Sequence, residues 1–91
     1  MRTSIQKNSR AEILIAEDSP TQAEQLRYIL EASNYSVIVA RNGKEALDAL
    51  VDNKPSLIIS DIQMPEINGF ELCKQIKSSP ETYNIPLILL T

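Results

Sequence analysis

Residues 12–18 of this 91-residue chain read EILIAED, and residues 57–61 read LIISD. Both are apolar runs with β-branched residues, which is typical of strands that are buried on both faces of a parallel sheet flanked by helices. Glu17 and Asp18 follow the first run, and Asp61 ends the second. Open parallel α/β sheets bind ligands beyond the carboxyl ends of their strands. We therefore expect these three carboxylates to converge in one crevice.

The chemistry of such a site must rest on carboxylates, because the chain has no histidine to act as a general base or zinc ligand. Carboxylates that lie close together raise one another's pKa or require a counter-cation, and their hard oxygens select a hard divalent ion such as Mg²⁺. Cys73 is the only cysteine, so we expect neither a disulfide nor a metal-thiolate cluster. A reducing cytoplasm is the simplest compartment for such a chain.

The length of the chain limits its organisation to one domain. Residues 1–10 carry three basic and no acidic residues and no apolar stretch, so we interpret them as a flexible basic tail or linker rather than a secretory signal. Residues 11–91, the expected domain, then carry a net charge of −6, which argues against nucleic-acid binding by the domain itself. No apolar run approaches the roughly 20 residues that a membrane span requires.

Three capping signals predict where helices begin. Ser19, Asn42 and Asn68 are each followed three residues later by Gln or Glu, which is typical of a helix N-terminus. The predicted helices cover residues 20–33, 43–53 and 69–78.

Each predicted helix carries an apolar stripe that we expect to face the core. Ile29 is expected beside the first stripe, Val51 on the second and Cys73, as a buried structural thiol, on the third. Further strands are expected over residues 35–40 and 85–91. The alternation of strands and helices predicts an α/β fold with a doubly wound parallel sheet and helices on both faces.

Three motifs in this order and spacing resemble the receiver domain of two-component response regulators, or of a hybrid histidine kinase, over residues 12–91. Residues 15–19 (IAEDS) are similar to the acidic pair after the first receiver strand, and residues 59–69 (ISDIQMPEING) to the phosphoacceptor loop. Thr91 follows Asp61 by thirty residues and closes an apolar strand. It resembles the hydroxyl residue that receivers place beside the phosphoryl group.

The resemblance implies a flavodoxin-like sheet with strand order 2-1-3-4 and a role for each site residue. Asp61 would accept a phosphoryl group from a sensor histidine kinase or a phosphotransfer protein, stoichiometrically and not as an enzyme in the ordinary sense. Asp18, Asp61 and the backbone carbonyl of Gln63 would bind Mg²⁺ directly, and Glu17 mainly through water. The hydroxyl of Thr91 would hydrogen-bond the bound phosphoryl group.

The chain departs from the receiver pattern at its end. Receivers continue through a helix, a fifth strand that ends in a lysine, and a last helix, whereas this sequence stops at Thr91. The expectation is therefore a receiver truncated before its fifth strand, in which Lys54, Lys74 and Lys77 cannot replace the missing lysine. The apolar fourth strand should then have an exposed edge. The alternative function is an association module that forms a homodimer through this edge.

Two other α/β classes fit the sequence less well. A haloacid-dehalogenase-type phosphatase also uses a strand-end aspartate and magnesium, but it requires a second aspartate two residues later, where this chain has Gln63. A dinucleotide-binding fold requires a glycine-rich turn after the first strand. Residues 17–20 (EDSP) would instead repel a pyrophosphate.

Overall fold

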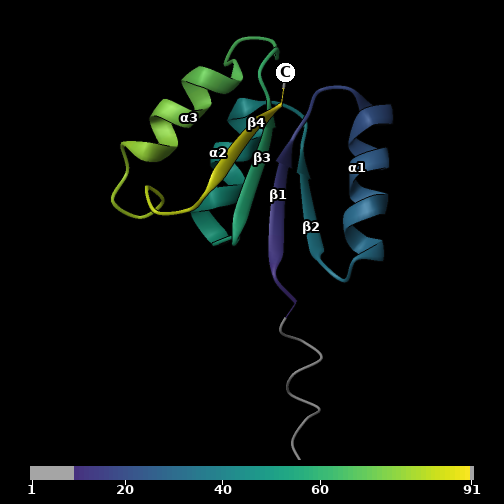
Figure 1. The fold of residues 1–91 in the computed structure, drawn as a ribbon. Coiled ribbons are helices and arrows are strands. Elements are labelled where there is room, and N and C mark those ends of the chain that lie inside the picture. The colour runs from purple at the N-terminus through teal and green to yellow at the C-terminus, as the bar shows by residue number, and fades with distance from the viewer. Residues whose placement is uncertain (1–9, 91) are drawn as a thin grey trace, which may run out of the picture.

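The structure, a computed structural model, describes residues 10–90 and alternates strands with helices along the chain (Figure 1). The elements in order are β1 (Glu12–Ala16), α1 (Pro20–Ala32), β2 (Ser36–Ala40), α2 (Gly43–Asp52), β3 (Leu57–Asp61), α3 (Gly69–Lys77) and β4 (Leu87–Leu90). Residues 1–9, which make up most of the expected tail, and Thr91 lie outside the described residues. Within residues 10–90, no helix combines the length and apolar character that a bilayer crossing requires.

All three helices begin at the predicted caps. The side chains of Ser19, Asn42 and Asn68 accept hydrogen bonds from the backbone N–H three residues on, at 3.3, 2.8 and 2.9 Å respectively. These bonds satisfy N–H groups that have no partner within the first helical turn. Each helix ends one residue earlier than predicted.

The end of α1 is shaped by Asn34, which the sequence analysis did not single out. Asn34 adopts a positive φ of 74°. The N–H groups of Asn34 and Tyr35 donate to the carbonyl oxygens of Glu31 and Leu30, at 3.0 and 3.1 Å. This pattern is a Schellman motif, in which asparagine tolerates the left-handed conformation better than most residues. The chain reverses there and enters β2 at Ser36.

The sheet is wholly parallel with strand order β2-β1-β3-β4, which confirms the doubly wound fold and the order that the resemblance implies. In register, Ala16 of β1 lies between Ala40 of β2 and Ser60 of β3. All strands therefore end at the same edge, from which the loops to α1 and α3 leave (Figure 1).

Helices cover both faces of the sheet, as predicted: α1 lies on one side, and α2 and α3 lie on the other (Figure 1). The larger core lies beneath α2 and α3 and contains Leu14, Ile58, Leu72 and Ile76, each no more than 1% exposed. A smaller cluster beneath α1 is built on Ile13, Ile15 and Ile59.

Three expected core positions are wrong or only partly right. Ile29 and Val51 are 59% and 76% exposed, and Cys73 is half-buried. The apolar stripes of α1 and α2 are narrower than their sequences suggest, because a helix on a flat sheet buries only the residues that point at it. Ile88 of β4 is also exposed, since α1 reaches only part of its face of the sheet among residues 10–90.

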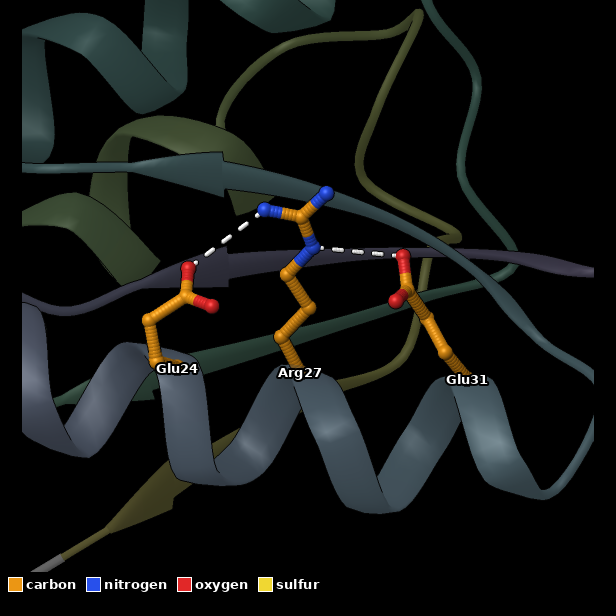
Figure 2. A network of polar contacts seen from close by, with 3 residues as sticks. All are labelled: Glu24, Arg27 and Glu31. Carbon is orange, nitrogen blue, oxygen red and sulfur yellow. Dashed lines mark hydrogen bonds and ion pairs between the residues drawn. The ribbon is translucent and has the colours of Figure 1, made fainter.

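One exposed side of α1 carries a charged network (Figure 2). Arg27 lies between two acidic residues, 3.4 Å from Glu24 and 3.2 Å from Glu31. The three side chains are well exposed, so water and salt screen the pairs and their effect on stability is small. The network covers only part of the exposed surface of α1, because Tyr28 and Ile29 are also exposed on this helix.

Candidate metal and phosphoacceptor site

Three carboxylates meet at the carboxyl edge of the sheet. Glu17 and Asp18 follow β1 directly, and Asp61 is the last residue of the adjacent strand β3. One carboxylate oxygen from each side chain lies within 4.8 Å of the others. Such a cluster concentrates negative charge at a single point, as the two strand-end motifs predicted.

The three carboxylates of the cluster differ in how deeply they are buried. Glu17 is only 5% exposed, whereas Asp18 is exposed and Asp61 is half-buried. Burial is the main cause that raises the pKa of Glu17, and the charges of Asp61 and Asp18 raise it further. A hydrogen bond of 3.1 Å, donated by the backbone N–H of Ser19 to Glu17 Oε2, lowers the pKa of Glu17 and so partly offsets this increase. A divalent cation would relieve the remaining repulsion, so the donor set fits a hard ion such as Mg²⁺.

The loop between β3 and α3 is anchored in the core. Met64 is 8% exposed and belongs to the larger core, and Ile67 packs against that core. Gln63, between Asp61 and Met64, has an exposed side chain and lies in the wall of a groove beside Asp18. The anchors on its C-terminal side hold this loop close to the carboxylates.

The same loop contains a strained turn at Glu66. This residue has a positive φ of 69°, and the N–H of Ile67 donates to the carbonyl of Pro65 at 2.8 Å. A positive φ together with this i to i+2 bond defines the less common form of the γ-turn, which is unfavourable for a residue with a side chain. The sequence offered no glycine or asparagine at this position to predict it.

Gly69 packs against the backbone at the end of β3. A Cβ added to Gly69 would lie 2.4 Å from the carbonyl oxygen of Asp61 and 2.8 Å from the Cα of Ile62. The N–H of Gly69 also donates to the carbonyl of Ile62 at 2.8 Å. The sequence analysis included Gly69 in the loop that resembles the phosphoacceptor loop, but did not predict this close approach to β3. Its place directly after the Asn68 cap was the available signal for this close approach.

Phe70 is a further residue that the sequence analysis missed. It is 61% exposed and lines the groove that also contains Asp18, Gln63 and Pro65. An exposed aromatic residue on the first turn of a helix was the signal, because the stripe of α3 does not require it.

The remaining predicted residues lie elsewhere. Thr91 is outside the described residues, so the structure does not place it. Lys54 is 3.7 Å from Glu81 in a hollow at the amino end of the sheet. The ammonium group of Lys77 donates to the carbonyl of Ile85 at 2.6 Å, beyond the C-terminal end of α3. Both are therefore engaged away from the carboxylates.

Comparison with known proteins identifies a family. The family profile described as the response regulator receiver domain matches residues 13–91. The polar-differentiation response regulator DivK of Brucella anthropi is 42% identical over 79 residues, which cover 87% of this chain and 64% of DivK.

Solved structures agree with this assignment. The signal receiver domain of a signal transduction histidine kinase from Syntrophus aciditrophicus is 53% identical, with a TM-score of 0.86 over 89% of this chain and 61% of that chain. The chemotaxis response regulator CheY4 of Vibrio cholerae is 28% identical, with a TM-score of 0.85 over 89% of this chain and 68% of that one. The chain thus spans about two thirds of the length of these proteins.

Proposed function

Because this chain belongs to the response regulator receiver domain family, we propose that it acts in two-component signalling by accepting a phosphoryl group on Asp61. The observation that carries this proposal is the convergence of Glu17, Asp18 and Asp61, whose carboxylate oxygens lie within 4.8 Å of one another. Asp61 alone among them ends the strand that leads into the anchored loop, and it is half-buried rather than fully solvated.

The residues that would hold Mg²⁺ are Asp18, Asp61 and the backbone carbonyl of Gln63, with Glu17 acting mainly through water. When bound, the ion neutralises the charge that would otherwise repel an anionic phosphoryl group from a carboxylate. The burial of Glu17 supports its indirect role, because the side chain is held by Ser19 at 3.1 Å.

In the proposed transfer, an oxygen of the Asp61 carboxylate attacks the phosphorus of a phosphohistidine. The new P–O bond forms as the P–N bond breaks, and the histidine nitrogen leaves with the electron pair. The side chain of Gln63 would lie beside the incoming group, and Thr91 would hydrogen-bond the transferred phosphoryl oxygens. Each chain accepts one group, so the reaction is stoichiometric and the chain is not an enzyme in the ordinary sense.

The donor is proposed to be a sensor histidine kinase or a phosphotransfer protein in the cytoplasm. The net charge of −6 over residues 11–91 gives no electrostatic attraction to nucleic acid, so we assign nucleic-acid binding to no surface of this domain.

Phosphoramidate tests the proposal without a cognate kinase, because it also donates across a P–N bond. The chain is incubated with phosphoramidate and Mg²⁺, and its intact mass is measured. We expect a single phosphoryl adduct on the wild type and on Asp52→Asn, an exposed control on α2, and none on Asp61→Asn. An adduct that persists in Asp61→Asn would refute the assignment of the acceptor.

A second candidate function, homodimerisation through β4, has one observation in its favour. Ile88 and Leu90 are 48% and 38% exposed on the strand at the edge of the described sheet. Exposed apolar edge strands tend to pair with other chains. Sedimentation of the wild type and of Ile88→Lys tests it: the wild type should associate as its concentration rises and the variant should not. Monomeric wild type at all concentrations would exclude this function.

A further inference from the structure

Ser60 is a polar side chain within an apolar strand, immediately before Asp61. It is fully buried, at 0% exposure. Its hydroxyl group donates a hydrogen bond of 2.9 Å to the carbonyl oxygen of Asp61. A buried hydroxyl without a partner is costly, whereas one that is satisfied locally also restrains the backbone group that it contacts.

The peptide group that follows Asp61 is restrained from a second side by Gly69. The closeness of Gly69 leaves no room for a Cβ, which would lie 2.4 Å from the same carbonyl oxygen. The N–H of Gly69 holds the next carbonyl, that of Ile62, at 2.8 Å, and the N–H of Ile62 donates to Leu90 at 3.1 Å. Residues 61 and 62 therefore have little freedom to rotate.

Rotation of this peptide would move the groups on both sides of it. The Cα–Cβ bond of Asp61 sets the direction of its carboxylate, and the carbonyl of Gln63 lies two peptide groups further on. We propose that Ser60 is a positioning residue: its hydroxyl fixes the carbonyl of Asp61 so that the carboxylate of Asp61 points at Glu17 and Asp18. The inference rests on the proposed function and adds a residue to it.

A simpler explanation of Ser60 is its size. In register it lies beside Ala16, which lies beside Ala40, and all three are no more than 2% exposed. Small side chains in this row let α2 and α3 approach the sheet. Alanine would meet that need equally well, so Ser60→Ala separates the two explanations by removing only the hydroxyl group.

Thr82→Val provides a matched control. Thr82 lies beyond the C-terminal end of α3 and is buried, at 7% exposure, and its hydroxyl donates to the carbonyl of Ile76 in the last turn of that helix at 2.7 Å. Both variants therefore lose a buried hydroxyl that donates to a backbone carbonyl, but only Ser60→Ala does so beside Asp61. The melting temperature is measured for each, to show that both are folded.

Two readouts test the positioning role in the full 91-residue chain. The first is hydrogen exchange of the Gly69 amide without metal, which Ser60→Ala should accelerate by about threefold to tenfold, the factor that one net hydrogen bond represents. The second is Mg²⁺ affinity, which Ser60→Ala should weaken by a similar factor of about threefold to tenfold. Thr82→Val should change neither.

The outcomes distinguish this inference from the proposed function. Exchange and affinity that are the same in Ser60→Ala as in Thr82→Val would overturn the positioning role, even if the wild type is phosphorylated. Faster exchange at Gly69 with unchanged Mg²⁺ affinity would also overturn it, because the restraint would then not reach the carboxylate. A wild type that accepts no phosphoryl group would refute the proposed function, while the exchange and Mg²⁺ comparisons would still decide the role of Ser60.

Discussion

Replacing Gly69 with alanine forces a methyl group against the backbone of β3. The new Cβ would lie 2.4 Å from the Asp61 carbonyl oxygen, 2.8 Å from the Ile62 Cα and 3.1 Å from Leu89 Cδ2. Ordinary van der Waals contact begins near 3.4 Å, so α3 and the end of β3 must separate by about 1 Å. Gly69 has no positive φ, so the cost arises from this contact and not from an unsuitable backbone conformation.

The expected loss in the free energy of unfolding is about 1–3 kcal/mol, the usual cost of overpacking, of which the better helix propensity of alanine offsets at most about 1 kcal/mol. Urea denaturation measures the loss, and Mg²⁺ titration measures its effect on the site, which we expect to weaken because Asp61 moves.

Gly43→Ala is the control for this variant. It also lies at the start of a helix, but its Cβ would meet the Ile67 side chain at 2.8 Å and not Asp61. We expect it to lose stability and to lose less Mg²⁺ affinity than Gly69→Ala, because it displaces the Ile67 anchor of the loop and not the strand that carries Asp61. A Gly69→Ala variant with wild-type stability and wild-type Mg²⁺ affinity would refute the reasoning.

Three further predictions follow from single positions. Burial raises the pKa of Glu17, so the folded state binds the proton of this carboxyl group more tightly than the unfolded state does. In EDTA, the free energy of unfolding should therefore fall as pH rises from the ordinary pKa of a glutamate through the raised pKa of Glu17. Glu17→Gln should flatten that slope in urea titrations at several pH values, and an unchanged slope would contradict the assignment. Leu72→Ala, at a site with 0% exposure, should cost about 2–5 kcal/mol in urea denaturation, and a loss below about 1 kcal/mol would argue against the packing of α3. Glu66→Gly should leave the free energy of unfolding unchanged or raise it, because glycine relieves the strain at φ 69°. The control Glu24→Gly, within α1, should lower the free energy of unfolding by about 1 kcal/mol. Equal losses in the two variants would show that the turn is not strained.

Local signals predicted most of the fold. Ser19, Asn42 and Asn68 cap their helices through hydrogen bonds to the backbone three residues on. The start of each helix can therefore be predicted from the sequence alone. The convergence of Asp18 and Asp61 followed from strand ends, because parallel strands share one carboxyl edge. The sequence therefore predicted that these carboxylates lie together, as the structure shows.

Features that depend on tertiary contacts were not predictable. The exposure of Ile29 and Val51 depends on where each helix meets the sheet, which the apolar pattern of a helix does not specify. The positive φ of Glu66 lies in a loop between buried Met64 and the Asn68 cap, and no residue type at position 66 signals it. The contacts of Ser60 and Gly69 with the Asp61 carbonyl depend on distances of a few ångströms between elements.

The most direct test of the central claim is calorimetric titration of the chain with Mg²⁺. If Glu17, Asp18 and Asp61 form one site, the wild type should bind one ion per chain. Asp18→Asn and Asp61→Asn should each weaken binding by at least about tenfold, and Glu24→Gln, on the outer face of α1, should bind like the wild type. Equal Mg²⁺ affinity in all four proteins would contradict a shared metal site at the carboxyl edge of the sheet.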